Sequence, residues 1–143
     1  MPYIVVDTCV FTRLDGIYRV VLGCFLGTDD VIAYSKEVLN EYKGRAPDLL
    51  ILMGFITRLT NAEKIKMFKR SYIDSHVKRY SRVRRINYPS HNRDRKWVNI
   101  AIAVIAKYII STDSHLLNIL PNHIENDIIK IIKPSQYMEI RCS

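Results

Sequence analysis

Four acidic residues stand where predicted strands and helices begin or end. Asp7 ends an apolar, β-branched run at the start of the chain, and Asp113 ends a second apolar run. Asp94 opens the amphipathic segment that leads into the second run, and Glu41 lies on a short predicted helix. In a parallel sheet, groups at the carboxyl ends of strands converge in one crevice. Converging carboxylates repel one another unless a cation lies among them, and hard divalent ions prefer oxygen ligands, so the four acids predict a metal site.

Each of these acids also has a purely structural interpretation. Asp94 and Asp113 can each cap the helix that they precede. Glu41 can be an exposed helix residue, and Glu37, one turn earlier, competes with it as the ligand, although Glu37 fits a capping position better. Asp7 is the hardest to explain in this way, because a carboxylate directly after a buried strand needs a partner.

Positive charge is concentrated in one part of the chain. The net charge of the 143 residues is +8, and the stretch 64–96 holds twelve basic residues but two acidic ones, so the rest of the chain is slightly acidic. Such a local excess is expected for a surface that binds phosphate groups. A solvated helix face rich in Lys and Arg is the structural alternative. The basic residues that we expect to contact nucleic acid are Arg82, Arg84, Arg85, Arg93, Arg95 and Lys96.

The elements that must position these residues alternate between strands and helices. This alternation predicts an α/β fold, a three-layer α/β/α sandwich with a mostly parallel central sheet, and the length fits a single domain over residues 1–143. We expect strands at Tyr3–Asp7, Val31–Tyr34, Val83–Tyr88, Tyr108–Ser111 and Ile128–Ile132. We expect helices at Phe11–Leu26, Lys36–Lys43, Pro47–Thr60, 61–80, Asp94–Lys107, Ser114–Leu120 and from Pro134 onward.

The cysteines and the N-terminal segment bear on the compartment. Cys9, Cys24 and Cys142 are odd in number and lack metal-ligand spacing, so we expect reduced thiols rather than a disulfide framework or a zinc site. The first apolar run ends at Asp7, which makes it too short for a signal peptide or a membrane span. We therefore expect a cytoplasmic protein without a membrane partner.

The order of these residues resembles a PIN domain. Val5–Thr8 resembles the opening strand of that family and its first acid, and Glu41 falls on the helix glutamate of the family. The closest similarity lies in Asp94–Trp97 and Ala106–Asp113, and Ile132–Met138 resembles the last strand and its Pro-led helix. The resemblance covers nearly the whole chain and is nearest to the subgroup of toxins from toxin–antitoxin pairs.

The resemblance implies a metal-dependent endoribonuclease that hydrolyses single-stranded RNA with Mg²⁺ or Mn²⁺ held by the four acids. Thr8 and Ser111 are expected to orient carboxylates or water through their hydroxyl groups. Cys9 departs from the pattern, because the family usually has Asn there, which weakens the support for Asp7. The resemblance also implies a homodimer and a small antitoxin protein as partners.

Two other functions are compatible with the sequence. The first is a housekeeping RNA-processing nuclease on the same fold that has no antitoxin. The second is a non-catalytic nucleic-acid-binding module, which would use the basic region and keep its binding after the acids are replaced. The apolar stretch Leu49–Phe55 is rich enough for part of a dimer interface and is equally compatible with internal core.

Overall fold

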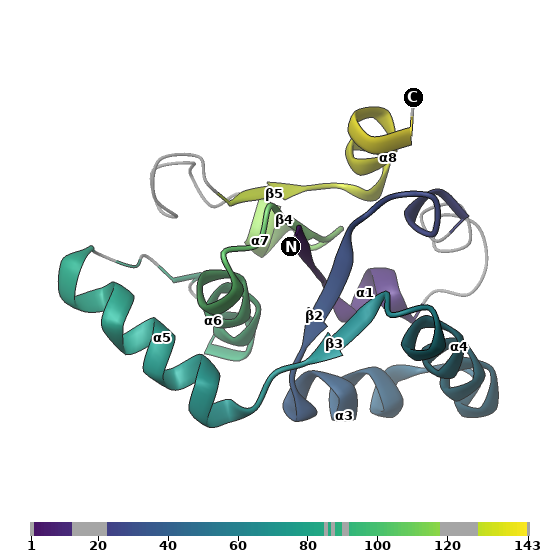
Figure 1. The fold of residues 1–143 in the computed structure, drawn as a ribbon, viewed down its shortest axis with the longest axis horizontal. Coiled ribbons are helices and arrows are strands. Elements are labelled where there is room, and N and C mark those ends of the chain that lie inside the picture. Colours follow the sequence, from purple (N-terminus) through teal and green to yellow (C-terminus); the bar gives the residue numbers. More distant parts are fainter. Residues whose placement is uncertain are drawn as a thin grey trace.

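A single parallel sheet forms the centre of the computed structural model, which describes residues 2–12, 23–84, 86, 88–89, 92–117 and 129–142. Within these residues the strand order is β3-β2-β1-β4-β5, and every neighbouring pair is parallel (Figure 1). The predicted α/β class with a parallel central sheet is confirmed. The strands are β1 (Tyr3–Val6), β2 (Val31–Tyr34), β3 (Ile65–Met67), β4 (Tyr108–Ile110) and β5 (Lys130–Ile132).

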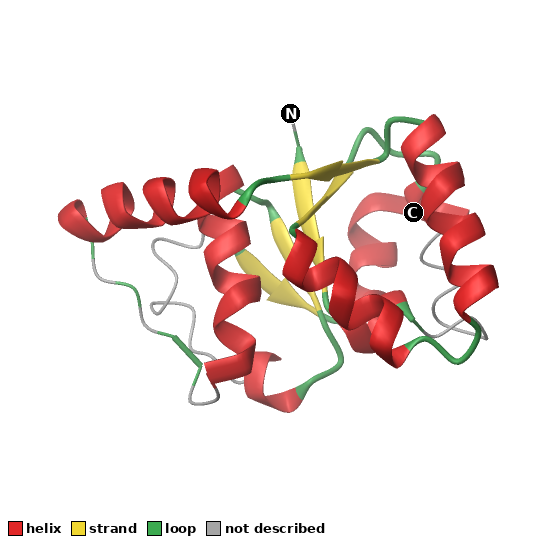
Figure 2. Ribbon diagram, turned by 90° about the horizontal axis from the view of Figure 1, so that it is seen from below, coloured by secondary structure: helices red, strands yellow, loops and turns green. Residues whose placement is uncertain are grey.

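Helices cover both faces of this sheet and make a three-layer sandwich. In Figures 1 and 2, α5 and α6 lie on one face, and α1, α3 and α4 lie on the other. None of the helices in the described part of the chain is long and apolar enough to cross a membrane. The helices are α1 (Thr8–Phe11), α3 (Lys36–Arg45), α4 (Leu49–Asn61), α5 (Arg70–Val83), α6 (Arg95–Val104), α7 (Ser114–Leu117) and α8 (Pro134–Cys142), with a 3₁₀ turn, η1 (Asn92–Asp94), before α6.

The strand order creates a topological switch point beside β1. The chain first extends the sheet from β1 through β2 to β3, and then returns to the other side of β1 to add β4 and β5. Val6 and Ile110 are paired in the register of β1 and β4, so these two strands end side by side. In open α/β sheets, ligands bind in the crevice outside the carboxyl ends of the strands at such a point. The residues that follow β1 and β4 therefore meet at the expected place for a site.

The core fixes α3 and α6 against this end of the sheet. Tyr42 on α3 is fully buried, stacks on Phe11 with ring centroids 4.1 Å apart, and donates a hydrogen bond from its hydroxyl to the carbonyl of Val6. Trp97 on α6 is 1% exposed and lies against Tyr42, with ring centroids 6.2 Å apart. Both helices are thereby anchored beside the last residue of β1, which also places the neighbouring residue Glu41 at that end.

The third strand lies in a different segment from the predicted one. The structure has β3 at Ile65–Met67, where we expected a helix, and β3 pairs with β2. The predicted strand Val83–Tyr88 is wrong, because Val83 ends α5 and the other described residues of that segment form no strand. Most of the predicted helix Phe11–Leu26 lies outside the described residues.

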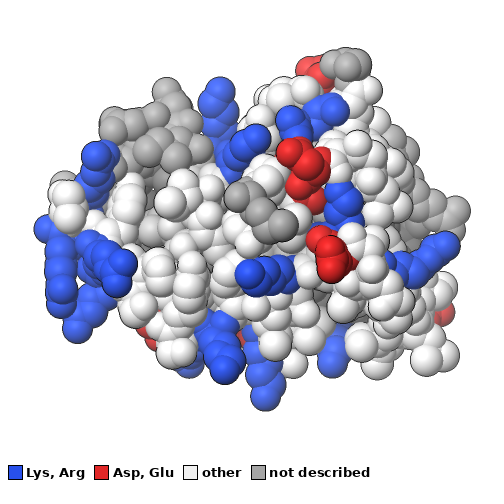
Figure 3. Space-filling model, in the orientation of Figure 1, with Lys and Arg blue, Asp and Glu red and all other residues white. Residues whose placement is uncertain are grey.

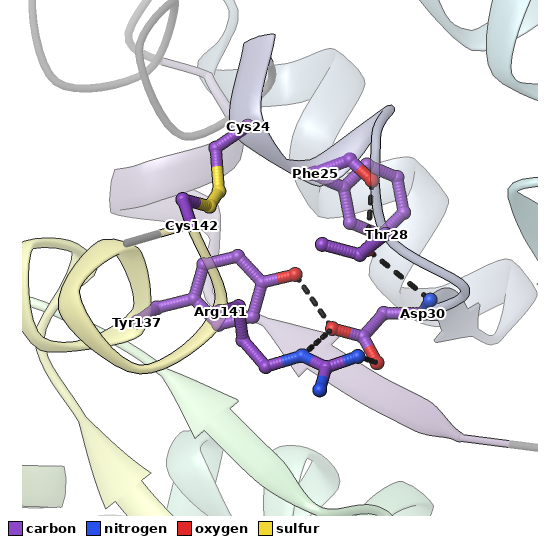
Figure 4. The surroundings of a disulfide bond; sticks show 7 residues. All are labelled: Cys24, Phe25, Thr28, Asp30, Tyr137, Arg141 and Cys142. Carbon is purple, nitrogen blue, oxygen red and sulfur yellow. Dashed lines mark hydrogen bonds and ion pairs between the residues drawn. A yellow bond between two sulfur atoms is a disulfide. The ribbon is translucent and has the colours of Figure 1, made fainter.

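A disulfide bond joins Cys24 to Cys142 at the end of α8 (Figure 4). The two Cα atoms are 5.8 Å apart, which is in the range usual for disulfides. The prediction of reduced thiols was therefore wrong for these two residues, whereas Cys9 is free. Cys24 and Cys142 are separated by 118 positions, so their spacing in the sequence does not predict a disulfide. The packing of α8 beside the segment that precedes β2 brings them together.

A buried ionic group fastens α8 to the residue before β2. Asp30 is fully buried, and its carboxylate accepts hydrogen bonds from the Tyr137 hydroxyl at 2.7 Å and from Arg141 Nε at 3.0 Å (Figure 4). A second nitrogen of Arg141 lies 3.1 Å from the other Asp30 oxygen. Burial, together with the neighbouring Asp30, raises the pKa of Tyr137. The Asp30 charge is thus paired with one arginine in the last turn of α8.

Candidate functional site

All four predicted acids line one pocket at the carboxyl ends of β1 and β4. The pocket has a volume of about 200 Å³. Asp7 and Asp113 come from the segments after these two strands, Glu41 comes from α3, and Asp94 from the turn before α6. The other residues of the wall are Thr8, Cys9, Arg45, Arg93 and Trp97. The structure therefore brings the four acids into one cavity, as the strand-end argument requires.

Asp7 is a buried carboxylate held by residues of the neighbouring strand end. It is 6% exposed, and its Oδ2 accepts a hydrogen bond of 2.6 Å from the Ser111 hydroxyl and a weaker contact of 3.5 Å from the Cys9 thiol. Burial raises the pKa of Asp7, and the charge of nearby Asp113 acts in the same direction, although the hydrogen bonds from Ser111 and Cys9 oppose it. Ionised Asp7 therefore carries a desolvation cost that its protein partners do not fully offset.

The raised pKa of Asp7 predicts that Asp7→Asn stabilises the protein in the absence of divalent ions. The unfolded chain loses the Asp7 proton as the pH rises through 3.8, the ordinary pKa of the group, whereas the folded protein keeps this proton until the raised pKa is reached. Between these two pKa values, folded wild-type protein therefore loses stability as the pH rises. Asp7→Asn lacks this loss. The difference in stability between the variant and wild type therefore grows over this pH range and is constant at higher pH. Thermal unfolding in EDTA as a function of pH checks this, and each 1 kcal/mol corresponds to about 2–4 °C in a domain of this size.

Equal pH profiles for wild type and Asp7→Asn would contradict that assignment. Asp48→Asn is the matched control, because Asp48 is exposed and caps α4 with an oxygen that Asn retains, through the contact of Asp48 Oδ1 with the Ile51 amide at 3.1 Å. At neutral pH the control should leave the melting temperature close to that of wild type.

Asp94 is a buried acid of the pocket wall. It is 7% exposed, lines the pocket, and makes no hydrogen bond or ion pair with the residues that the structure describes. Although it precedes α6, its backbone is αR and its side chain does not cap the helix. The capping interpretation of Asp94 is therefore wrong. A buried carboxylate without a partner is costly, which favours a cation from outside the protein as its missing neighbour.

Glu41 is held from two sides. Thr8 Oγ1 donates a hydrogen bond to one oxygen of Glu41, and Lys96 Nζ lies 2.9 Å from the other. The same lysine nitrogen donates to the carbonyl of Arg93 at 2.6 Å. Lys96, one of the predicted phosphate contacts, thus forms an ion pair with a pocket acid, and its contact with phosphate stays a prediction. Glu37 lines a separate groove, so Glu41 is the glutamate of this helix that belongs to the acidic pocket.

Ser111 connects the two strand ends. Besides its hydrogen bond to Asp7, its oxygen accepts one from the backbone N–H of Asp113 at 2.9 Å. Cys9 lies in the same cluster, because the Thr112 hydroxyl donates to its sulfur at 3.1 Å. The Cys9 thiol thus stays within reach of Asp7, although a thiol is a weaker hydrogen-bond donor than an amide.

The oxygen donors fit Mg²⁺ or Mn²⁺ in kind, although they are not gathered into a closed coordination set. Among the described residues, no group of three or more His, Cys, Asp or Glu side chains lies close enough to hold one ion. The four carboxylates are the donors that hard divalent ions prefer. Burial is the main cause of the raised pKa of Asp7, and the charge of Asp113 adds to it, so a cation beside these two acids would stabilise their ionised forms.

The predicted basic residues divide between the two ends of α5 and α6. Arg82 lies on α5 and Arg84 directly after it, and both are exposed, whereas Arg85 is outside the described residues. Figure 3 shows Lys and Arg side chains gathered where α5 lies and along the lower edge of that view. Arg93 lines the acidic pocket, and Arg95 lines the neighbouring groove with Lys96.

Sequence reasoning missed one charged residue of the pocket wall. Arg45 ends α3 and lines the acidic pocket, four positions after Glu41. That spacing places two side chains on the same face of a helix, so it was the available signal. The predicted helix ends at Lys43, before Gly44, whereas α3 continues to Arg45.

Known protein families and curated proteins offer no match to this chain. No family model matches it, and neither does any curated protein. The similarity to PIN domains therefore stays a prediction that rests on the order of its residues.

Proposed function

We propose that this protein is a metal-dependent endoribonuclease whose reaction takes place in the acidic pocket. The observation that carries the proposal is the buried carboxylate of Asp94, which has no partner among the described residues and lines one cavity with Asp7, Glu41 and Asp113 at the switch point of the sheet. The whole chain has a net charge of +8, and its basic residues are concentrated in the stretch 64–96. A cluster of acids in a basic protein suits a divalent ion and a polyanionic substrate together.

In this proposal Asp7, Asp94 and Asp113 hold Mg²⁺ or Mn²⁺, with Glu41 as the fourth acid. Such an ion lowers the pKa of bound water towards neutrality and offsets charge on the phosphate oxygens. Ser111 keeps Asp7 oriented through its 2.6 Å hydrogen bond. The hydroxyl of Thr8 has the same role for Glu41.

Lys96 gives the pocket an internal counter-charge. Its nitrogen contacts Glu41 at 2.9 Å and is fixed by the Arg93 carbonyl, so Glu41 is neutralised without any ion from solution. This contact keeps the pocket from carrying four uncompensated acids, and it places a cation beside the position where a phosphate would meet the carboxylates.

The proposal extends to the toxin class and its partners. Leu49, Leu50 and Ile51, at the start of α4, are 50%, 85% and 54% exposed, whereas Leu52 is fully buried. Adjacent exposed apolar side chains are typical of interaction surfaces. They support a homodimer or a small antitoxin as the partner, and they make the internal-core interpretation of this segment wrong for its first turn.

Cleavage of a labelled single-stranded RNA in Mn²⁺, Mg²⁺ and EDTA tests the proposed activity. We expect cutting with either ion and none in EDTA, because the pocket acids need a cation to act on phosphate. Asp7→Asn, purified in parallel, should lose the activity. Cutting that persists in EDTA would contradict the proposal. RNA binding without cutting, equal in both proteins, would instead favour a non-catalytic nucleic-acid-binding module.

A further inference from the structure

A second, larger groove adjoins the acidic pocket. Its volume is about 690 Å³, and it lies between the start of α3, the segment from β3 into α5, and the start of α6. Lys96 lines this groove, whereas its ion-pair partner Glu41 lines the acidic pocket 2.9 Å away. The two cavities are therefore neighbours, and the Lys96–Glu41 contact lies between them.

The charge of the groove is opposite to that of the pocket. The groove has five cationic side chains against two carboxylates, and the pocket has four carboxylates against two cations. An extended polyanion gains attraction from the groove but not from the metal-free pocket. The cationic residues of the groove are Lys36, Lys69, Arg70, Arg95 and Lys96.

The remaining lining suits a nucleotide better than a simple anion. Asn40, Asn92 and Asn99 line the groove together with the exposed side chain of Met67. The oxygen of Asn99 accepts a hydrogen bond of 2.5 Å from the Tyr88 hydroxyl, and its amide nitrogen makes no hydrogen bond within the described residues. Amide donors beside apolar surface are the groups that contact the edges and faces of unpaired bases. The volume lies within the range of pockets that enclose small organic ligands.

We propose that this groove binds the stretch of single-stranded RNA adjoining the scissile phosphate, with Lys36, Lys69 and Arg70 on its phosphates and Asn99 beside a base. The inference rests on the proposed nuclease function, because it identifies where the substrate of that pocket continues. The Lys96 end of the groove directs the strand towards the acids. A single strand, rather than a duplex, presents the unpaired bases that the amides of this groove would contact.

Binding of a fluorescent RNA of about 12 nucleotides, measured by anisotropy in EDTA, tests the groove without cleavage. The groove variant is the double charge reversal Lys69→Glu with Arg70→Glu, two exposed residues. The matched control is the double variant Lys107→Glu with Lys130→Glu, which changes the net charge by the same amount. Both lysines are exposed, and they lie at the amino ends of β4 and β5, opposite to the strand ends that border the acidic pocket. We expect the groove variant to bind about tenfold or more weakly and the control to change by less than about twofold.

The salt dependence supplies an independent readout. The slope of log K against log salt should fall by about 0.7 for each phosphate contact that the groove variant loses, and should stay unchanged in the control. A single-stranded DNA of the same sequence shows whether the groove distinguishes the two sugars. Equal losses in both double variants would overturn the inference, as would an acidic peptide that binds at this groove as tightly as RNA.

Failure of the groove and failure of the nuclease give different results. If RNA is cut in Mn²⁺ and the groove variant binds and cuts like wild type, the groove inference is wrong and the nuclease stands. If nothing is cut but the groove variant still loses binding selectively, the groove stands and the proposed catalysis is wrong. Circular dichroism and melting temperatures of both double variants establish that each is folded.

Discussion

Asp94→Asn is expected to lower the rate of RNA cleavage by about 10²- to 10³-fold, the loss typical when one electrostatic stabiliser of a transition state is removed. The fold should be retained, because this carboxylate is 7% exposed, makes no hydrogen bond or ion pair with the described residues and does not cap α6. Asparagine has almost the same size and removes a buried charge that has no partner among the described residues. Single-turnover cleavage in Mn²⁺, together with a thermal melt in EDTA, measures both effects.

The control for this variant is Asp48→Asn, which removes an acid from the exposed start of α4. It should cut at the wild-type rate. Wild-type cleavage by Asp94→Asn would show that this residue is not part of the catalytic pocket. A variant that melts well below wild type would show instead that Asp94 has a structural partner.

Arg141→Ala is expected to lower the free energy of unfolding by about 3–5 kcal/mol, because it leaves a buried charge without its partner. Asp30 is fully buried, and Arg141 supplies two of its contacts, at 3.0 and 3.1 Å. The Tyr137 hydroxyl, at 2.7 Å, donates a hydrogen bond but no charge. Urea unfolding under oxidising conditions, which keep the disulfide intact in both proteins, measures the difference.

A second variant separates the lost charge from lost packing. Arg141→Met with Asp30→Asn removes both charges and should recover most of the stability that Arg141→Ala loses, because no buried charge is then left alone. Arg58→Ala, at an exposed position of α4, should change the free energy of unfolding by less than about 0.5 kcal/mol. If Arg141→Ala is as mild as Arg58→Ala, the ionic group does not hold α8.

The sequence was most informative for strands that are followed by an acid or framed by turn residues. β2 falls at Val31–Tyr34 as predicted, and β1 and β4 each end one residue before the predicted boundary. β3 was missed because Ile65–Met67 is three residues long, and its last two side chains are exposed. A strand of three residues is too short to show a period of two, and the basic segment that follows it forms the helix α5.

The site was predicted as far as it depends on strand ends. Asp7 and Asp113 follow paired strands, so the parallel-sheet rule alone places them together. Contacts between side chains on different helices could not be predicted in this way. The Lys96–Glu41 ion pair depends on how α6 and α3 are docked by Trp97 and Tyr42, and such packing leaves no local pattern in the sequence.

The Cys24–Cys142 bond has a topological consequence for how the sheet assembles. Once this bond has formed, residues 24–142 are a closed covalent loop that contains β2, β3, β4 and β5, while β1 belongs to a tail outside it. Yet β1 is the middle strand, and it separates β2 from β4. The oxidised chain can complete its sheet only when this tail is inserted between β2 and β4 of the loop. The strand that positions Asp7 therefore also connects the β2–β3 part of the sheet to the β4–β5 part.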